Sequence, residues 1–409
     1  MNHDMEVLRE LAKQLAEIAH LPQQEEKRAL WRRLNGKQDT RPMVMIDQVC
    51  WNEMNVNDEL TLVCQDAEMR AYEDFLRMKL YQWRHFPCDM VVEPYIPVQK
   101  AIRGITLGVG VQEDIAITDD TNSVRSHQYK NQFQTDADLE LIKMPTITHD
   151  VQETNRRMSI AHDVFDGVMD VKAMGADPYL SIWDPISTWM GPEALLYAIA
   201  DRPDYMHALT GRVTDAYMSM LDQLEEQGLL CQPQPLIHCT GAYTDELPKP
   251  GYNPEKPRLQ DIWMFALAQI FSTVSPACFE AFEVNYVNRI CERFGLVYYG
   301  CCDPLDRKMA QVRKIKNVRK VSVSPWCDQE LAGREIHGDF VFSRKPNPAY
   351  LAGSWQPDLV RNDLLETIRI SKDNNCQLEL ILKDISTVRY EPQRLWEWNK
   401  IAMELVENA

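Results

Sequence analysis

Long apolar runs and positive charge are both scarce in this chain of 409 residues. No segment approaches the roughly 18 unbroken apolar residues of a membrane-spanning helix. The chain has 44 Lys and Arg against 61 Asp and Glu, so its formal net charge is −17. A surface this acidic repels phosphate groups, which argues against nucleic acid and anionic membranes as partners. The amino-terminal residues also lack the basic-then-apolar order of a secretory signal, so we expect a cytoplasmic protein.

Cysteine is too sparse for a disulfide scaffold. The chain contains 11 Cys, an odd number. With no export signal, this count predicts reduced thiols, most of them acting as small core residues. The spacings Cys-x-x-Cys and His-Glu-x-x-His are absent as well. A metal site in this chain would therefore have to be assembled from residues that are distant in sequence.

The sequence does contain a regular alternation of short β-type runs and amphipathic helices. Residues 4–34 predict two helices that are separated at Pro22, and residues 206–227 and 276–294 predict two more. Alternation of strand and helix favours a parallel sheet, and about eight such units in one domain favour a (β/α)8 TIM barrel. The predicted β runs are residues 42–47, 90–97, 169–175, 235–240, 296–302, 320–326, 340–345 and 377–384.

We expect residues 1–40 to form an N-terminal helical extension and residues 41–409 to form a single TIM-barrel domain. Residues 103–148 interrupt the alternation, because they carry a β pattern and turn signals but no strong helix. We interpret them as a β-rich insertion near the barrel mouth. A doubly wound sheet would also fit the alternation, but neither Gly-x-Gly-x-x-Gly nor a P-loop motif opens a helix, so the sequence does not indicate a nucleotide site.

Candidate metal ligands follow several of the predicted strands, where the catalytic groups of a barrel gather. Cys301 and Cys302 follow an apolar run, while His238 and Asp384 close two other runs. A catalytic zinc ion takes three ligands of these types and keeps one position open. The alternative is packing, because adjacent cysteines in a strand point to opposite faces and His238 would then be a hydrogen-bonded core histidine.

Charged residues close other runs. Arg344 and Lys345 lie side by side and would form an anion or carboxylate clamp, or else remain surface charges. Lys383 and Asp384 would form an acid–base pair, or else a salt bridge that only holds the mouth together. Together with Glu93, which would orient a substrate, Lys383 and Asp384 are the candidate catalytic residues.

Tryptophans also follow strand-like runs. Trp51, Trp183 and Trp326 would line an aromatic pocket, since such side chains suit an apolar or aromatic ligand. The alternative for each of them is a place in the core.

The order of these strand-end motifs resembles the uroporphyrinogen decarboxylase superfamily, from about residue 42 to the carboxyl terminus. Residues 184–204 (DPISTWMGPEALLYAIADRPD) resemble the family's segment after its third strand. LVYYGCCDP, VFSRKPNP and ILKDISTVRYEP resemble its fifth, seventh and eighth strands. The superfamily includes tetrapyrrole decarboxylases and zinc-dependent methyltransferases that exchange methyl groups with corrinoid proteins.

The resemblance favours the methyltransferase branch. The heme-pathway decarboxylases have an arginine-rich segment after the first strand, whereas residues 47–53 (DQVCWNE) contain no arginine, so we exclude uroporphyrinogen as the substrate. The methyltransferase branch has His-x-Cys after its fifth strand and a further Cys after its eighth. Cys301 matches the first Cys position, Tyr299 stands at the His position, and Asp384 lies at or beside the second Cys position. The implied zinc ligand set is therefore altered, and its imidazole is missing unless His238 replaces it.

The resemblance implies a methyltransferase that moves a methyl group from a small donor, such as a methoxylated aromatic, to a corrinoid protein. Zinc held by Cys301 with Cys302 or His238, or an acid such as Asp384, would activate the donor's leaving heteroatom. The corrinoid would be on a partner, because the carrier motif Asp-x-His-x-x-Gly is absent. A homodimer is compatible with this assignment.

Two other functions remain open from the sequence. The first is a metal-free decarboxylase of a small carboxylic acid, in which Arg344 and Lys345 hold the carboxylate. The second is a corrinoid or tetrapyrrole carrier without enzymatic activity.

Overall fold

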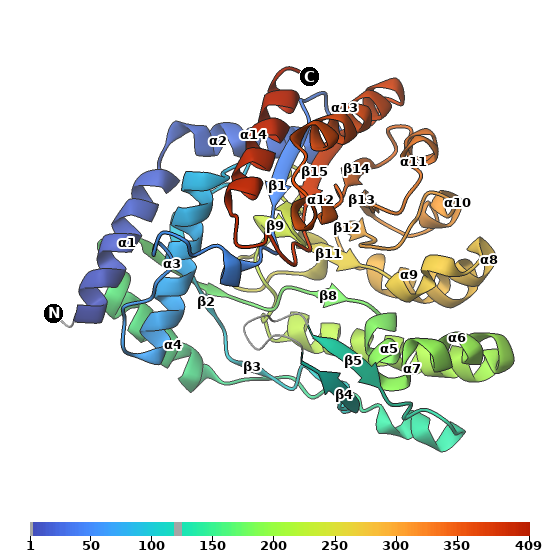
Figure 1. Cartoon of the computed structure of the whole chain (residues 1–409). Helices are drawn as coiled ribbons and strands as arrows, with labels where there is room; N and C mark the ends of the chain where they lie inside the picture. The colour runs from blue at the N-terminus through green and yellow to red at the C-terminus, as the bar shows by residue number, and fades with distance from the viewer. Residues whose placement is uncertain (1–2, 118–124) are drawn as a thin grey trace.

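A central sheet of seven parallel strands organises the protein, whose computed structural model describes residues 3–117 and 125–409 (Figure 1). All six ladders of this sheet are parallel. The first strand of the chain pairs with the last, which is compatible with a barrel-like α/β fold. In spatial order the strands are β1 (Met43–Ile46), β15 (Leu378–Leu382), β14 (Val341–Arg344), β13 (Val318–Val323), β12 (Leu296–Tyr299), β11 (Trp263–Ala266) and β8 (Tyr179–Leu180).

A closed ring of eight strands is not shown by these ladders. Within the described residues, the edge strands β1 and β8 do not pair with each other. Two further strands, β2 (Tyr95–Gln99) and β7 (Asp170–Met174), pair in parallel as a separate two-stranded sheet. One backbone hydrogen bond, from Asp89 N to Val44 O at 2.9 Å, connects the segment before β2 to β1. The closed TIM barrel therefore stays a prediction.

Five of the eight predicted β runs form strands of the central sheet, and the runs at 90–97 and 169–175 supply β2 and β7. The run at 235–240 is different: it forms an antiparallel hairpin of β9 (Leu236–Ile237) and β10 (Thr240–Gly241). Sequence reasoning missed β8 and β11. The four residues of β11 are all buried, so they show no alternation, and β8 has only two residues.

The predicted helices are present. α1 (His3–Ala19) and α2 (Pro22–Asn35) cover the amino-terminal segment, and α7 (Pro203–Glu226) covers the run at 206–227. The segment at 276–294 contains α8 (Pro276–Phe279), the π-helical turn η5 (Glu280–Val284) and α9 (Asn285–Cys291). The other α-helices are α3 (Ala67–His85), α4 (Val151–Phe165), α5 (Trp183–Met190), α6 (Pro192–Asp201), α10 (Met309–Val312), α11 (Gln329–Ile336), α12 (Ala349–Ala352), α13 (Pro357–Asp373) and α14 (Gln393–Glu407). No helix of the described residues is long and apolar enough to cross a membrane.

The segment at 103–148 contains β structure in its described part. The hairpin of β4 (Glu113–Ala116) and β5 (Ser126–Tyr129) is antiparallel, and β3 (Ile102–Arg103) pairs with β6 (Thr148–His149) at the ends of the segment. The part of this prediction that falls on residues 118–124 lies outside the described residues. Figure 1 shows the hairpin beside α5, the helix that follows β8. The domain boundaries at 40 and 41 remain a prediction.

A buried charge network fixes the β9–β10 hairpin against the sheet. The ammonium of Lys320 on β13 donates to Glu379 Oε2 at 2.7 Å and to Thr240 Oγ1 and Gly241 O, both at 3.0 Å. The Lys320 and Glu379 side chains are completely buried. Because a buried charge is stable only when it is paired and hydrogen-bonded, this network holds the hairpin in one position. The tip of the hairpin, His238 and Cys239, is held with it.

Candidate functional site

Side chains from three separate segments meet at the carboxyl end of the sheet. They are His238 at the hairpin tip, Cys301 and Cys302 after β12, and Lys383 and Asp384 after β15. Cys301 Sγ lies 3.5 Å from His238 Nε2 and 3.6 Å from Cys302 Sγ. Cys302 Sγ lies 3.5 Å from Asp384 Oδ2. The structure therefore brings together all four residues that the sequence predicted as metal ligands.

The two thiols lie on the same side because the strand ends before them. Gly300 has a φ of +87°, a conformation that favours glycine, and it turns the chain directly before Cys301. The alternation that would direct adjacent cysteines to opposite faces therefore no longer applies. Asp384 also has a positive φ, +56°, and its carboxylate lies 2.9 Å from the ammonium of the preceding Lys383.

Lys383 lies at the centre of the cluster. Its Nζ atom lies 3.2 Å from Cys301 Sγ, 3.4 Å from His238 Nε2 and 2.9 Å from Asp384 Oδ2. It also lies 3.4 Å from the side-chain oxygen of Gln48, which follows β1. The side chain of Lys383 is only 3% exposed, so its charge depends on these partners.

The surroundings of the two thiols shift their pKa values in opposite directions. Contact with the Cys302 sulfur lowers the pKa of Cys301, and His238 and Lys383 lower it further against the opposing effect of burial. The pKa of Cys302 is raised, first by the same contact and then by burial. Burial opposes the charge of Lys383, but Cys301 and Asp384 raise its pKa above the ordinary value. These contacts favour the thiolate form at Cys301 over the thiolate form at Cys302.

Aromatic side chains support His238. Its ring stacks on Phe265 of β11, with ring centres 3.7 Å apart, and the ring of Tyr179 lies 6.3 Å away. Tyr179 donates a hydrogen bond to Asp184 Oδ2 at 3.0 Å. Burial raises the pKa of Asp184, and the nearby Cys301 raises it further, so this pair faces the thiolate.

Tyr179 was not among the predicted site residues, because β8 is too short to be recognised. Asp184 had a signal, since it begins the family-like segment at 184–204.

Arg344 and Lys345 point in opposite directions. Lys345 is buried beside the hairpin and donates to Tyr298 OH and to Ser343 Oγ. Burial lowers the pKa of Lys345 to about 8. Arg344 instead donates to Ser324 O at 2.6 Å and lies 3.8 Å from Asp363 of α13. The structure therefore does not bring the two cations together as a clamp.

The predicted tryptophans and Glu93 pack against other partners or face solvent. Trp51 packs against Tyr81 and Phe86, and Trp183 is fully buried against Phe271. Trp326 is 72% exposed. Glu93 accepts hydrogen bonds from Tyr243 OH and from Arg28.

The cluster does not fit a zinc ion in this arrangement. Among the described residues, no group of three or more His, Cys, Asp or Glu side chains is placed to hold a metal ion. The four predicted ligands contact one another in succession, in the order His238, Cys301, Cys302 and Asp384. The atom that contacts three of them, His238, Cys301 and Asp384, is Lys383 Nζ. Zinc would need at least three of these donors within about 2.0–2.3 Å of one point.

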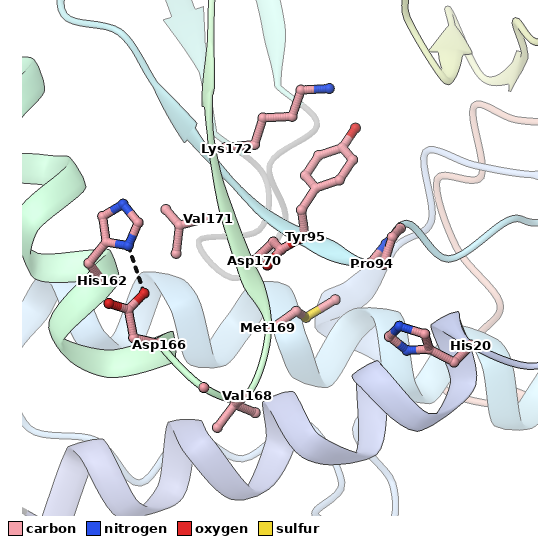
Figure 2. A pocket seen from close by; sticks show the side chains of 11 residues that line it. His20, Pro94, Tyr95, His162, Asp166, Val168, Met169, Asp170, Val171 and Lys172 are labelled. Atoms are coloured by element: carbon pink, nitrogen blue, oxygen red, sulfur yellow. Dashed lines mark hydrogen bonds and ion pairs between the residues drawn. The ribbon is translucent and has the colours of Figure 1, made fainter.

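A cavity of about 600 Å³ lies elsewhere, at the amino ends of β2 and β7. Figure 2 shows His162 hydrogen-bonded to Asp166 on one side of β7, with Tyr95 and Lys172 above them and His20, which follows α1, at the other side. The amino ends of parallel strands are the end at which barrel folds build stability rather than catalysis. None of the thiol-cluster residues lines this cavity.

No protein-family model matches the chain, and no curated protein matches its sequence. Among solved structures, a methyltransferase from Methanosarcina mazei is similar, with 10% sequence identity and a TM-score of 0.50. The match covers 93% of this chain and 97% of that chain. At this identity the likeness concerns the fold, so over nearly its whole length this chain has the fold of that methyltransferase.

Proposed function

We propose that this protein is a methyltransferase that transfers a methyl group from a small methylated compound to a corrinoid carried by a partner protein. The observation that carries the proposal is the cluster of Cys301, Lys383 and Asp384 at the carboxyl end of the sheet. The similarity of fold to a methyltransferase supports it. A methoxylated aromatic is the donor we favour, and assignment to the corrinoid-dependent branch of the uroporphyrinogen decarboxylase superfamily belongs to the same proposal.

In this reaction the reduced corrinoid attacks the methyl carbon. The cobalt electron pair forms the new bond, the bond from carbon to the heteroatom breaks, and its electron pair stays on the heteroatom. Negative charge therefore develops on the leaving group. Lys383 is the buried cation at the site, and it donates a hydrogen bond to that atom. A preorganised donor of this kind accounts for roughly 10²–10³ in rate.

Asp384 completes the proton balance. Its side chain is 49% exposed and lies 2.9 Å from Lys383 Nζ, so it has access both to solvent and to the ammonium. The proton that ends on the leaving heteroatom comes from water by way of this carboxylate. Zinc has no part in these steps, because three of its candidate donors surround the Lys383 ammonium instead.

The proposal is tested with the purified chain, free cob(I)alamin as the methyl acceptor and a panel of methoxyphenols as donors. We expect methylcobalamin and the demethylated phenol to form in equal amounts. A parallel assay measures CO₂ release from a panel of small carboxylic acids. Release of CO₂ without any methyl transfer would identify a decarboxylase instead and would overturn the proposal.

A further inference from the structure

The position expected for a metal ion is filled by a nitrogen atom of the chain itself. Lys383 Nζ is within 3.4 Å of a thiol sulfur, an imidazole nitrogen and a carboxylate oxygen, which are the donor types of a zinc site. We propose that the Lys383 ammonium takes the place of the zinc ion implied by the family resemblance and pairs directly with the Cys301 sulfur, without a metal.

Burial supports this assignment. Cys301 is 4% exposed and the Lys383 side chain 3%, so neither charge is stabilised by bulk water. A negative charge on Cys301 therefore needs Lys383, whereas the ammonium pairs with both Cys301 and Asp384, because an unpaired charge in such a place is strongly disfavoured. A zinc ion on the same thiolate would lie next to the ammonium, and the two positive charges would repel each other.

The surroundings of the thiol pair contain charges of both signs. Groups that favour the thiolate are Cys302, His238, Lys383 and Lys345. Groups whose negative charge opposes it are Asp184, Asp303 and Asp384. Two phenols, Tyr179 and Tyr298, also face the thiolate. Lys383 Nζ lies 3.2 Å from the Cys301 sulfur, so its removal takes away the ammonium in contact with that sulfur.

The pair gives the site a defined chemical preference. A thiolate held beside an ammonium accepts hydrogen bonds and repels anions, whereas the ammonium binds a neutral or anionic oxygen or sulfur. A small ether or thioether is compatible with both the thiolate and the ammonium, because its heteroatom accepts a hydrogen bond from Lys383. This substrate preference rests on the proposed methyl transfer, but the existence of the pair does not.

The test measures the ionisation of Cys301 and the metal content separately from methyl transfer. Ultraviolet thiolate absorbance is recorded against pH for the whole chain and for Cys301→Ser, Lys383→Met and Lys383→Arg. Lys172→Met is the matched control, because Lys172 lines the distant cavity of Figure 2. Metal content is measured after dialysis of the wild-type chain against zinc.

We expect one thiolate in the wild type that titrates well below the roughly 8.5 of a free thiol and is absent in Cys301→Ser. Lys383→Met raises the midpoint by about 1–3 pH units, Lys383→Arg restores most of the shift, and Lys172→Met leaves the midpoint unchanged.

Zinc content after dialysis stays below about 0.2 per chain, since zinc sites in proteins bind tightly. The proposal is overturned if about one zinc ion binds per chain and a chelator restores the reactivity of Cys301. It is equally overturned if the midpoint does not move in Lys383→Met. Wild-type titration and zinc binding decide the question even if a variant fails to fold.

Discussion

At the scale of residues, the sequence predicts which residues of the cluster lie at strand ends, but it does not predict the directions of their side chains. Cys301, Cys302, His238 and Asp384 were each predicted at a strand end, and all four meet. The central position of Lys383 was not predicted, because it follows from the positive φ of Asp384 and from the rotamer of a long side chain. Tyr299, at the family's histidine position, donates to Glu283 instead of facing the thiols.

Gly300 is the residue whose substitution tests the turn before the thiols. In Gly300→Ala the new Cβ would lie 2.5 Å from Leu305 Cδ1 at a φ of +87°. We expect a loss of about 1–2 kcal/mol from the backbone conformation, together with a further loss from the contact, in urea unfolding. Gly167→Ala is the matched control, because its φ is +76° and no atom lies within 4 Å of its Cβ position. Equal losses in the two variants would contradict the predicted role of the Leu305 contact.

Glu283 gives the protein a pH-dependent stability. It is fully buried in η5, and burial raises its pKa from 4.5 to about 8. Between these values the native state holds a proton that the unfolded state releases, so this group's contribution to stability falls as the pH rises. We therefore expect the wild type to lose stability relative to Glu283→Gln between pH 5 and pH 8, as measured by urea unfolding. A difference that is constant with pH would show that Glu283 is ionised in the native state.

At the scale of elements, the hairpin of β9 and β10 is the largest departure from the expected pattern. Residues 235–240 have the composition of a strand, but the positive φ values of His238 and Cys239 turn the chain back. Neither a β pattern nor a propensity encodes this turn, since it depends on tertiary contacts with Lys320 and Glu379. The helices were easier to predict because their apolar spacing is periodic.

The buried pair that holds this hairpin predicts a specific coupling. Glu379→Gln and Lys320→Met should each destabilise the protein by about 3–5 kcal/mol, because each leaves one buried charge without its partner. The double variant should lose much less than the sum of the two. Urea unfolding of the four proteins measures this coupling, and strictly additive losses would show that the two charges act independently.

At the scale of the whole molecule, the carboxyl-terminal segment completes the sheet. β15 pairs with β1 on one side and with β14 on the other, and Lys383 and Asp384 follow it directly. The barrel-like arrangement was predictable from the number and order of the strand–helix units. Closure of the ring, which the sequence also predicted, is not shown by the ladders of the described residues, and periodicity contains no information on how the segment around β2 meets β1.

Removal of residues 377–409 should therefore prevent cooperative folding, because it deletes α14 and also β15, which lies between β1 and β14 in the sheet. Circular dichroism during thermal unfolding and size-exclusion chromatography measure this outcome. Removal of Ala409 alone, an exposed terminal residue, is the control and should leave the transition unchanged. A truncated chain that remained monomeric with a sharp transition would contradict the assigned sheet order.

The most direct measurement of the central claim is the rate of methyl transfer to cob(I)alamin in the wild type, in Cys301→Ser and in Cys278→Ser. Cys278 is a half-buried cysteine of α8 and provides the matched control. We predict that Cys278→Ser retains the wild-type rate and that Cys301→Ser loses roughly 10²-fold or more, because the sulfur that positions Lys383 Nζ at 3.2 Å is then missing. A wild-type rate in Cys301→Ser would mean that the chemistry takes place outside this cluster.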